Sequence, residues 1–133
     1  MAKDGLVILE SGHPAAETAE RIKAEIEKRG MSIFARVDHA AAARTAGMQL
    51  RPTEVLMFGS PRAGTPLMQA DQTIGIDLPL KLLVWEDEGG EVRISYNDPV
   101  WLGGRHGLPD SEGEHLKAMA AGLRAIAAAA AAL

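Results

Sequence analysis

A β-hairpin signal in the second half of the chain constrains the fold most. Two runs rich in apolar residues, Leu80 to Glu86 and Val92 to Tyr96, flank the tetrapeptide Asp87-Glu88-Gly89-Gly90. Paired glycines tolerate the positive φ angles that tight hairpin turns require. The pattern therefore predicts two neighbouring strands that pair in an antiparallel manner.

The N-terminal half of the chain predicts alternating strands and helices. Leu6 to Leu9 is strand-like, and a helix begins near Pro14 with apolar residues at helical spacing and ends at Gly30. The alternation from Met31 to Val37 predicts a second strand. Asp38 is then expected to cap a short helix that Gly47 terminates.

The remaining signals predict one more strand, two turns and a long helix. Glu54 to Phe58 is the third strand, and a glycine-proline loop follows it and leads to a helical turn around Leu67 to Ala70. Asn97-Asp98-Pro99 predicts a turn after the hairpin. Ser111 and Glu114 have the spacing of a capping box, which is expected to start the last helix.

These elements together predict a single α+β domain over residues 1–133. We expect a mostly antiparallel sheet of about five strands, with two main helices packed on one face. The other face of the sheet is then solvated, covered by a ligand or buried in a dimer.

Composition and charge restrict the class of protein. With 47% hydrophobic and 24% charged residues, the chain has the composition of a globular domain. Its formal net charge of −4 and the absence of a basic run argue against a nucleic-acid partner. No stretch predicts a membrane span or a signal peptide, so the expected compartment is the cytoplasm. The absence of cysteine excludes disulfides, thiolate metal sites and thiol nucleophiles.

The segment from Gly59 to Thr65 is the main candidate for a binding site. A buried-looking strand leads directly into it, and Gly59, Pro61 and Gly64 restrict its backbone. The arrangement Gly59-x-x-x-x-Gly64-Thr65 fails as a phosphate-binding P-loop, because Thr65 and Pro66 stand where Lys and Ser or Thr are needed. A weaker hypothesis remains, in which backbone amides near Gly64 and the side chain of Arg62 hold an anion.

Acid–base and metal chemistry have less support. Asp38, His39 and Asp77 are candidates for proton transfer, although Asp38 as a helix cap and Asp77 as a turn residue or as an ion-pair partner of Arg51 or Arg62 are the simpler interpretations. The four histidines show no ligand spacing, so no metal site is predicted and His106 is expected to be a surface residue. Nothing specific indicates haem or another cofactor.

Several short motifs in order indicate a family resemblance. The chain resembles the bacterial domain-of-unknown-function family numbered 302 through Asp38-His39, Leu50-Arg51-Pro52, Phe58-Gly59-x-Pro61, Gly64-Thr65-Pro66-Leu67-Met68, Asp77-Leu78-Pro79 and Tyr96-Asn97-Asp98-Pro99. The resemblance covers nearly the whole chain. It implies a compact α+β fold similar to the TATA-binding-protein-like arrangement, often as a homodimer, and it implies no reaction.

Three functional hypotheses follow. The first is a homodimeric protein that binds a small anionic ligand, with His39 as a further contact and these candidate binding residues: Arg51, Gly59, Ser60, Arg62, Gly64, Thr65 and Tyr96. The second is a cofactor-free enzyme that uses Asp38, His39 and Asp77, which requires the three side chains to converge in one pocket. The third is a protein-interaction module that uses the open sheet face.

Overall fold

The protein is built on one five-stranded sheet in which every neighbouring pair is antiparallel. The computed structural model describes residues 3–133. The spatial order is β1-β5-β4-β3-β2. The strands are β1 (Leu6–Glu10), β2 (Ser32–Asp38), β3 (Thr53–Gly59), β4 (Leu80–Glu86) and β5 (Val92–Asn97). The predicted hairpin is the β4–β5 pair, and the predicted α+β class is confirmed.

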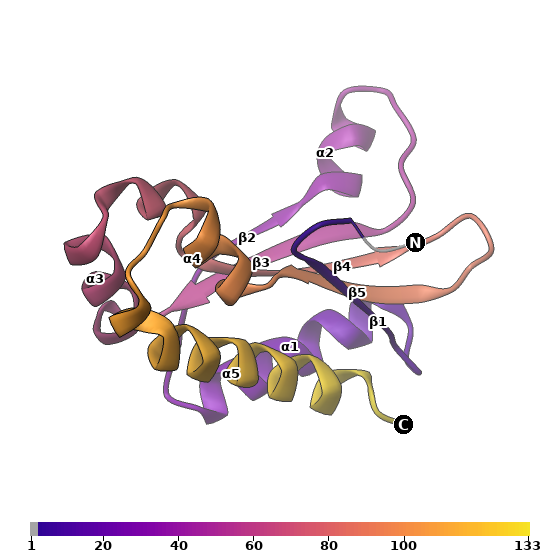
Figure 1. Cartoon of the computed structure of the whole chain (residues 1–133). Coiled ribbons are helices and arrows are strands. Elements are labelled where there is room, and N and C mark those ends of the chain that lie inside the picture. Colours follow the sequence, from indigo (N-terminus) through magenta and orange to yellow (C-terminus); the bar gives the residue numbers. More distant parts are fainter. Residues whose placement is uncertain (1–2) are drawn as a thin grey trace.

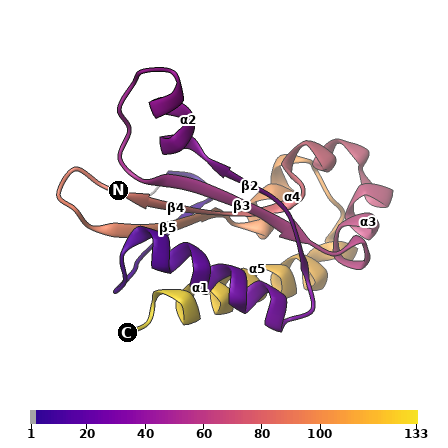
Figure 2. The same ribbon diagram turned by 180° about the vertical axis from the view of Figure 1, so that it is seen from behind.

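Helices are placed unevenly around this sheet. They are α1 (Ala15–Lys28), α2 (His39–Thr45), α3 (Pro61–Ala70), α4 (Pro99–Arg105) and α5 (Gly113–Ala131), with 3₁₀ helices η1 (Gln72–Asp77) and η2 (Asp110–Glu112). The long helices α1 and α5 lie side by side beneath the sheet in Figures 1 and 2, and α2 rises on the opposite side. Helices α3 and α4 lie together at one end of the sheet.

Apolar side chains fill the layer between the sheet and the two long helices. Alternate strand residues point toward α1 and α5, and the apolar spacing of those helices turns one stripe of each toward the sheet. The core residues that are at most 2% exposed include Ile22, Ile26, Leu56, Phe58, Leu82, Val84, Ile94, Leu123 and Ile126. The predicted packing of two main helices on one face is confirmed.

A second, smaller hydrophobic cluster lies under α3, η1 and α4. Its buried members are Leu67, Ile74, Leu102, Leu116 and Met119. Leu80 packs against both clusters, so it connects the two. We call the unit formed by α3, η1 and α4 the side lobe.

Local signals in the N-terminal half are confirmed. Gly30 follows α1 with a φ of +76°, and Gly47 follows α2 with a φ of +77°. The side chain of Asp38 caps α2, because its Oδ1 accepts a hydrogen bond from the N–H of Ala41 at 2.9 Å. Pro14 takes the N-cap position of α1, one residue before the first helical turn.

The predicted loop between Gly59 and Thr65 is wrong, because α3 begins within it at Pro61. Ser60 is the N-cap, and its Oγ accepts a hydrogen bond from the N–H of Arg62 at 3.2 Å. Proline suits the first turn of a helix, where its missing N–H needs no partner. A glycine-proline segment interpreted as a loop is therefore the start of a helix.

Another helix, α4, begins at the predicted turn Asn97-Asp98-Pro99. Asp98 caps α4, with its Oδ1 accepting from the N–H of Val100 at 3.0 Å, and Pro99 occupies the first turn. The predicted capping box of Ser111 and Glu114 is wrong. Glu112 is the N-cap of α5 without a side-chain bond, because Ser111 belongs to η2.

The face of the sheet away from α1 and α5 carries both apolar and polar side chains, and we call it the open face. Residues that pair across neighbouring strands have their side chains on the same face of the sheet. Ser95 pairs with both Ile8 and Leu83, so these three share the open face. Val55 pairs with Leu83 and with Val37, so both valines lie on this face too. Most of these side chains are only half-buried, and Ile8 is 41% exposed. The long helices leave this surface uncovered (Figure 1).

Asp87 makes the β4–β5 turn sensitive to acid. Its carboxylate accepts hydrogen bonds from the N–H groups of Glu91 and Gly89 and from Arg93, and these hold its pKa below the ordinary value, the bond from Glu91 most. A lowered pKa contributes stability above the ordinary carboxyl range, and that stability is lost as the pH falls through the folded-state pKa. We expect Asp87→Asn to lower Tm near neutral pH, with a difference from wild type that shrinks as the pH falls below the ordinary carboxyl range.

Thermal unfolding followed by circular dichroism across that pH range measures this difference. Glu88→Gln changes a neighbouring carboxylate of the same turn and is the matched control. A difference in Tm between Asp87→Asn and wild type that stays constant with pH contradicts the prediction.

Candidate functional site

The Gly59–Thr65 segment lines a cavity of about 320 Å³. It contributes all of its residues except Arg62 to the wall, where β3 ends and α3 begins. The opposite walls come from β2, the side lobe, the start of β4 and α5. The cavity therefore lies where the side lobe meets the sheet.

Apolar side chains dominate the walls of this cavity. They are Met31, Phe34, Phe58, Met68, Leu78, Pro79, Leu80 and Met119, and no charged residue is among the lining. Such a lining favours an apolar ligand body. Methionine side chains are flexible and polarisable, so the three methionines of this lining adapt readily to different ligand shapes.

Backbone amides at the start of α3 are already occupied. The N–H groups of Ala63 and Gly64 donate to the carbonyl oxygen of Ser60 at 3.0 and 3.2 Å, and the N–H of Arg62 donates to the Ser60 hydroxyl. Pro61 has no N–H to offer. The expected cradle of free amides near Gly64 is therefore absent from this part of the chain.

Arg62 supplies the positive charge of this segment. It is exposed, and its guanidinium forms no ion pair or hydrogen bond with any side chain or carbonyl in residues 3–133. Its neighbours Pro61 and Ala63 both line the cavity. The charge of Arg62 is therefore unpaired within the described residues, and Arg62 itself is not part of the cavity wall.

Two further predicted binding residues lie elsewhere. Arg51 donates from Nε to the carbonyl oxygen of Glu86 at 3.2 Å and lines a separate hollow with Arg44 and Leu50. Tyr96 faces the helix layer and is 6% exposed, and burial raises the pKa of its hydroxyl. Neither residue contributes to the cavity beside Gly59.

The three proposed acid–base residues have different surroundings. Asp38 caps α2, and His39 lines a hollow that includes Lys81. Asp77 pairs with Arg105 and His106, so the predicted partners Arg51 and Arg62 are wrong. Asp38, His39 and Asp77 do not line a common cavity.

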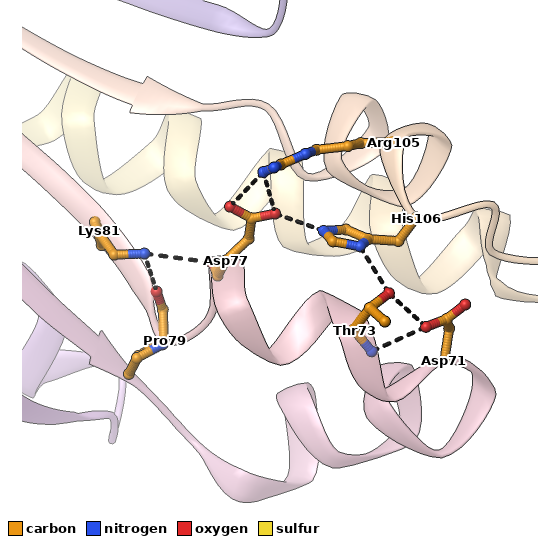
Figure 3. Close-up of polar contacts among 7 residues, drawn as sticks. All are labelled: Asp71, Thr73, Asp77, Pro79, Lys81, Arg105 and His106. Carbon is orange, nitrogen blue, oxygen red and sulfur yellow. Dashed lines mark hydrogen bonds and ion pairs between the residues drawn. The ribbon is translucent and has the colours of Figure 1, made fainter.

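Asp77 belongs to a polar network that connects η1 to the end of α4 (Figure 3). Its carboxylate accepts from Arg105 at 2.8 and 3.0 Å and from His106 Nε2 at 2.5 Å. The other ring nitrogen of His106 lies 2.9 Å from the hydroxyl of Thr73, which in turn contacts Asp71 at 2.5 Å. His106 is only 8% exposed, so the prediction of a surface histidine is wrong.

The Thr73 hydroxyl donates its proton to Asp71 and not to His106. A threonine hydroxyl has one proton, and the Asp71 carboxylate takes it. Bonds from the Thr73 side chain and backbone also hold the pKa of Asp71 below its ordinary value. The oxygen of this hydroxyl lies 2.9 Å from Nδ1 of His106, and its proton points to Asp71. The network joins two elements instead of activating a nucleophile.

Comparison with known proteins identifies the family. A family model described as "Domain of unknown function DUF302" matches residues 7–130. The chain belongs to the DUF302 family. The resemblance inferred from the short motifs is thereby confirmed.

Two curated relatives and one solved structure are similar to this DUF302 chain. Brucella suis and Brucella abortus proteins named "Fluoride-specific ion channel FluC 1" are each 51% identical to it over 118 residues, which is 89% of this chain. Those residues span 46% and 44% of the two relatives, so this chain covers about half of their length.

The solved structure supports the fold. The crystal structure of an uncharacterized conserved DUF302 protein from Bacillus stearothermophilus matches with a TM-score of 0.85 over 96% of this chain and 99% of that chain, at 18% identity. At that identity the match shows the shared fold alone.

Within residues 3–133, no helix combines the length and apolar character that a membrane crossing needs. In the same range, no three His, Asp or Glu side chains gather closely enough to hold a metal ion.

The sequence analysis missed the network because its members are far apart along the chain. Asp77 and His106 are separated by 29 residues, and Thr73 and His106 by 33. One signal was available in the sequence, because the capping residue Asp98 followed by Pro99 is a typical helix start. The helix that begins there is α4, and its C-cap is the buried residue His106. Interpreting that pattern as a turn left His106 in a loop.

We expect Asp77→Ala to lower the free energy of unfolding by about 1–3 kcal/mol, because it leaves His106 and Arg105 without their carboxylate partner. Urea unfolding measures the change. Asp110→Ala is the matched control, since Asp110 is an exposed carboxylate with no side-chain partner in residues 3–133. Equal losses in both variants contradict a stabilising role for the network.

Proposed function

We propose that this DUF302 protein binds a small organic acid, with the apolar body of the ligand in the cavity beside α3 and its acidic group at Arg62. The observation that carries the proposal is the apolar cavity itself, lined by Phe58, Met68 and Met119 among others. A preformed apolar cavity with a few polar groups at its edge is the usual form of a small-molecule site.

The size of the cavity indicates the size of the ligand. Its volume of about 320 Å³ lies at the lower end of the range typical for ligand sites. A ligand that buries roughly 200 Å² of apolar surface gains about 5 kcal/mol at ~25 cal/mol per Å². Binding in the micromolar to millimolar range is therefore expected from the apolar contacts.

Arg62 favours an acid over a neutral ligand. Its guanidinium has no carboxylate partner in the described chain, and the cavity walls carry no opposing charge. A planar guanidinium binds a carboxylate through two parallel hydrogen bonds. Because Arg62 is exposed, this contact selects the acidic group more than it increases affinity.

Fluoride is not the ligand that we propose for this cavity, although the Brucella relatives carry the name of a fluoride channel. A small, strongly hydrated anion needs several N–H donors to replace its water. The amides of Ala63 and Gly64 are occupied by Ser60, and the walls are apolar. The cavity suits an apolar ligand body much better than a bare halide ion.

Gly64→Leu tests the location of the ligand. A Cβ at this position meets Leu78 and Met68 at 3.5 and 3.8 Å, which are ordinary contacts, so a longer side chain extends into the cavity. We expect the variant to fold and to lose at least tenfold in affinity for hexanoate, benzoate and indole-3-acetate, measured by isothermal titration calorimetry.

Matched variants separate the two parts of this proposal. Gly122→Leu makes the same change at a helical glycine of α5 with open space around it and is expected to bind like wild type. Arg62→Ala is expected to bind the acids and their neutral amides equally weakly. Equal affinity of Gly64→Leu and wild type overturns the proposal.

The proposal includes the homodimer and the cytoplasmic location expected from the sequence. Ile8 of the open face and Trp101 of α4 are each 41% exposed and offer apolar surface to a second copy. We expect light scattering after size exclusion to give a mass of twice the 14.1 kDa of one chain, because burying these side chains removes apolar surface from water. A mass of one chain over a micromolar concentration series contradicts the dimer.

A further inference from the structure

A hollow of about 260 Å³ lies on the open face, separate from the cavity beside α3. Alternation along β4 divides the two sites, since Leu80 lines the cavity and Lys81 lines the hollow. The hollow is formed by β1, β3, β4, β5 and the first residue of α2. Its lining residues are Leu6, His39, Val55, Lys81, Leu83, Ser95, Tyr96 and Asn97.

Lys81 brings a positive charge to this hollow without a carboxylate to neutralise it. Its Nζ donates to the carbonyl oxygens of Pro79 and Asp77 at 3.2 and 3.4 Å (Figure 3). Both bonds are long, and no Asp or Glu of residues 3–133 lies within ion-pair distance. An ammonium group has three protons, so at least one donor remains for a ligand.

Ser95 adds a buried donor on the same face. The residue is 4% exposed, and its Oγ accepts a hydrogen bond from Trp85 Nε1 at 2.8 Å. Because the indole N–H can only donate, the hydroxyl proton of Ser95 must find another acceptor, and the described chain provides none. A buried O–H without an acceptor is costly, so a ligand oxygen at this place would satisfy it.

Two other polar side chains of the hollow can each donate a hydrogen bond. The side chains of His39 and Asn97 form no hydrogen bond within residues 3–133, and both line the hollow. No acidic residue lines it. Leu6, Val55 and Leu83 supply an apolar wall.

From this convergence we infer that the hollow is a second binding site, which takes the carboxylate of a short-chain organic acid at Lys81 and Ser95. The short hydrocarbon of the acid packs on Leu83 and Val55. A carboxylate has the two oxygens needed to accept from the ammonium and the hydroxyl together. The site stands apart from the cavity beside α3 and does not depend on the function proposed there.

Titration with butyrate, followed in ¹H–¹⁵N NMR spectra, tests this site. We expect saturable shifts that are largest at the amides of Leu6, Leu83 and Ser95. Butyramide is expected to give no saturable shifts, because it lacks the negative charge.

Variants assign the binding to the two donors. Lys81→Met keeps most of the side-chain stem and removes the charge, and we expect at least tenfold weaker butyrate binding. Ser95→Ala is also expected to weaken binding. Lys117→Met, at an exposed lysine of α5, is expected to bind butyrate like wild type.

Two results overturn the inference. One is the absence of saturable shifts in the wild-type spectra at butyrate concentrations up to about 50 mM. This result also overturns the inference if its cause is a dimer that buries Lys81. The other is equal affinity in Lys81→Met and wild type. If circular dichroism shows that Lys81→Met does not fold, the location of the shifts in the wild-type spectra tests the site instead. Shifts centred on Gly64 and not on Leu83 contradict it.

Discussion

Alternation of side chains along β4 is the constraint on which the rest of the structure depends. Leu82 and Val84 point into the layer beneath the sheet and are at most 1% exposed, where α1 and α5 cover them. Lys81 and Leu83 point to the open face. A shift of one residue in the register of this strand would exchange the two sets, which would bury a lysine in the core and expose leucine and valine.

The fold was predictable from the sequence wherever local chemistry decides it. Glycine stops after α1 and α2 and the cap at Asp38 each depend on a few neighbouring residues, and the structure confirms them. The hairpin was equally clear, because the turn and both strands are contiguous. The errors at Pro61 and Pro99 share one cause, since proline after a capping residue starts a helix as readily as it breaks one.

The candidate sites were less predictable, because they depend on which distant residues meet. The segment from Gly59 to Thr65 does line a cavity, but its chemistry is set by Met31, Phe34 and Met119, which lie in other parts of the chain. His39 was singled out for proton transfer with Asp38 and Asp77. It lies instead beside Lys81, a residue that no local pattern distinguishes from an ordinary strand lysine. The hydrophobic periodicity of a strand predicts the face of the sheet on which a side chain lies, but it does not predict which residues of the neighbouring strands lie beside it.

The side lobe has its own hydrophobic cluster, with the Asp77–His106 network holding its outer edge together. The cavity beside α3 lies at the junction between this unit and the main core, where Leu80 contacts both. Because Leu116 and Met119 of this cluster belong to α5, the lobe packs on the same helix that covers the sheet. Phe58 from the main core and Met119 from the smaller cluster both line the cavity, so its walls are only as rigid as the packing where the two clusters meet.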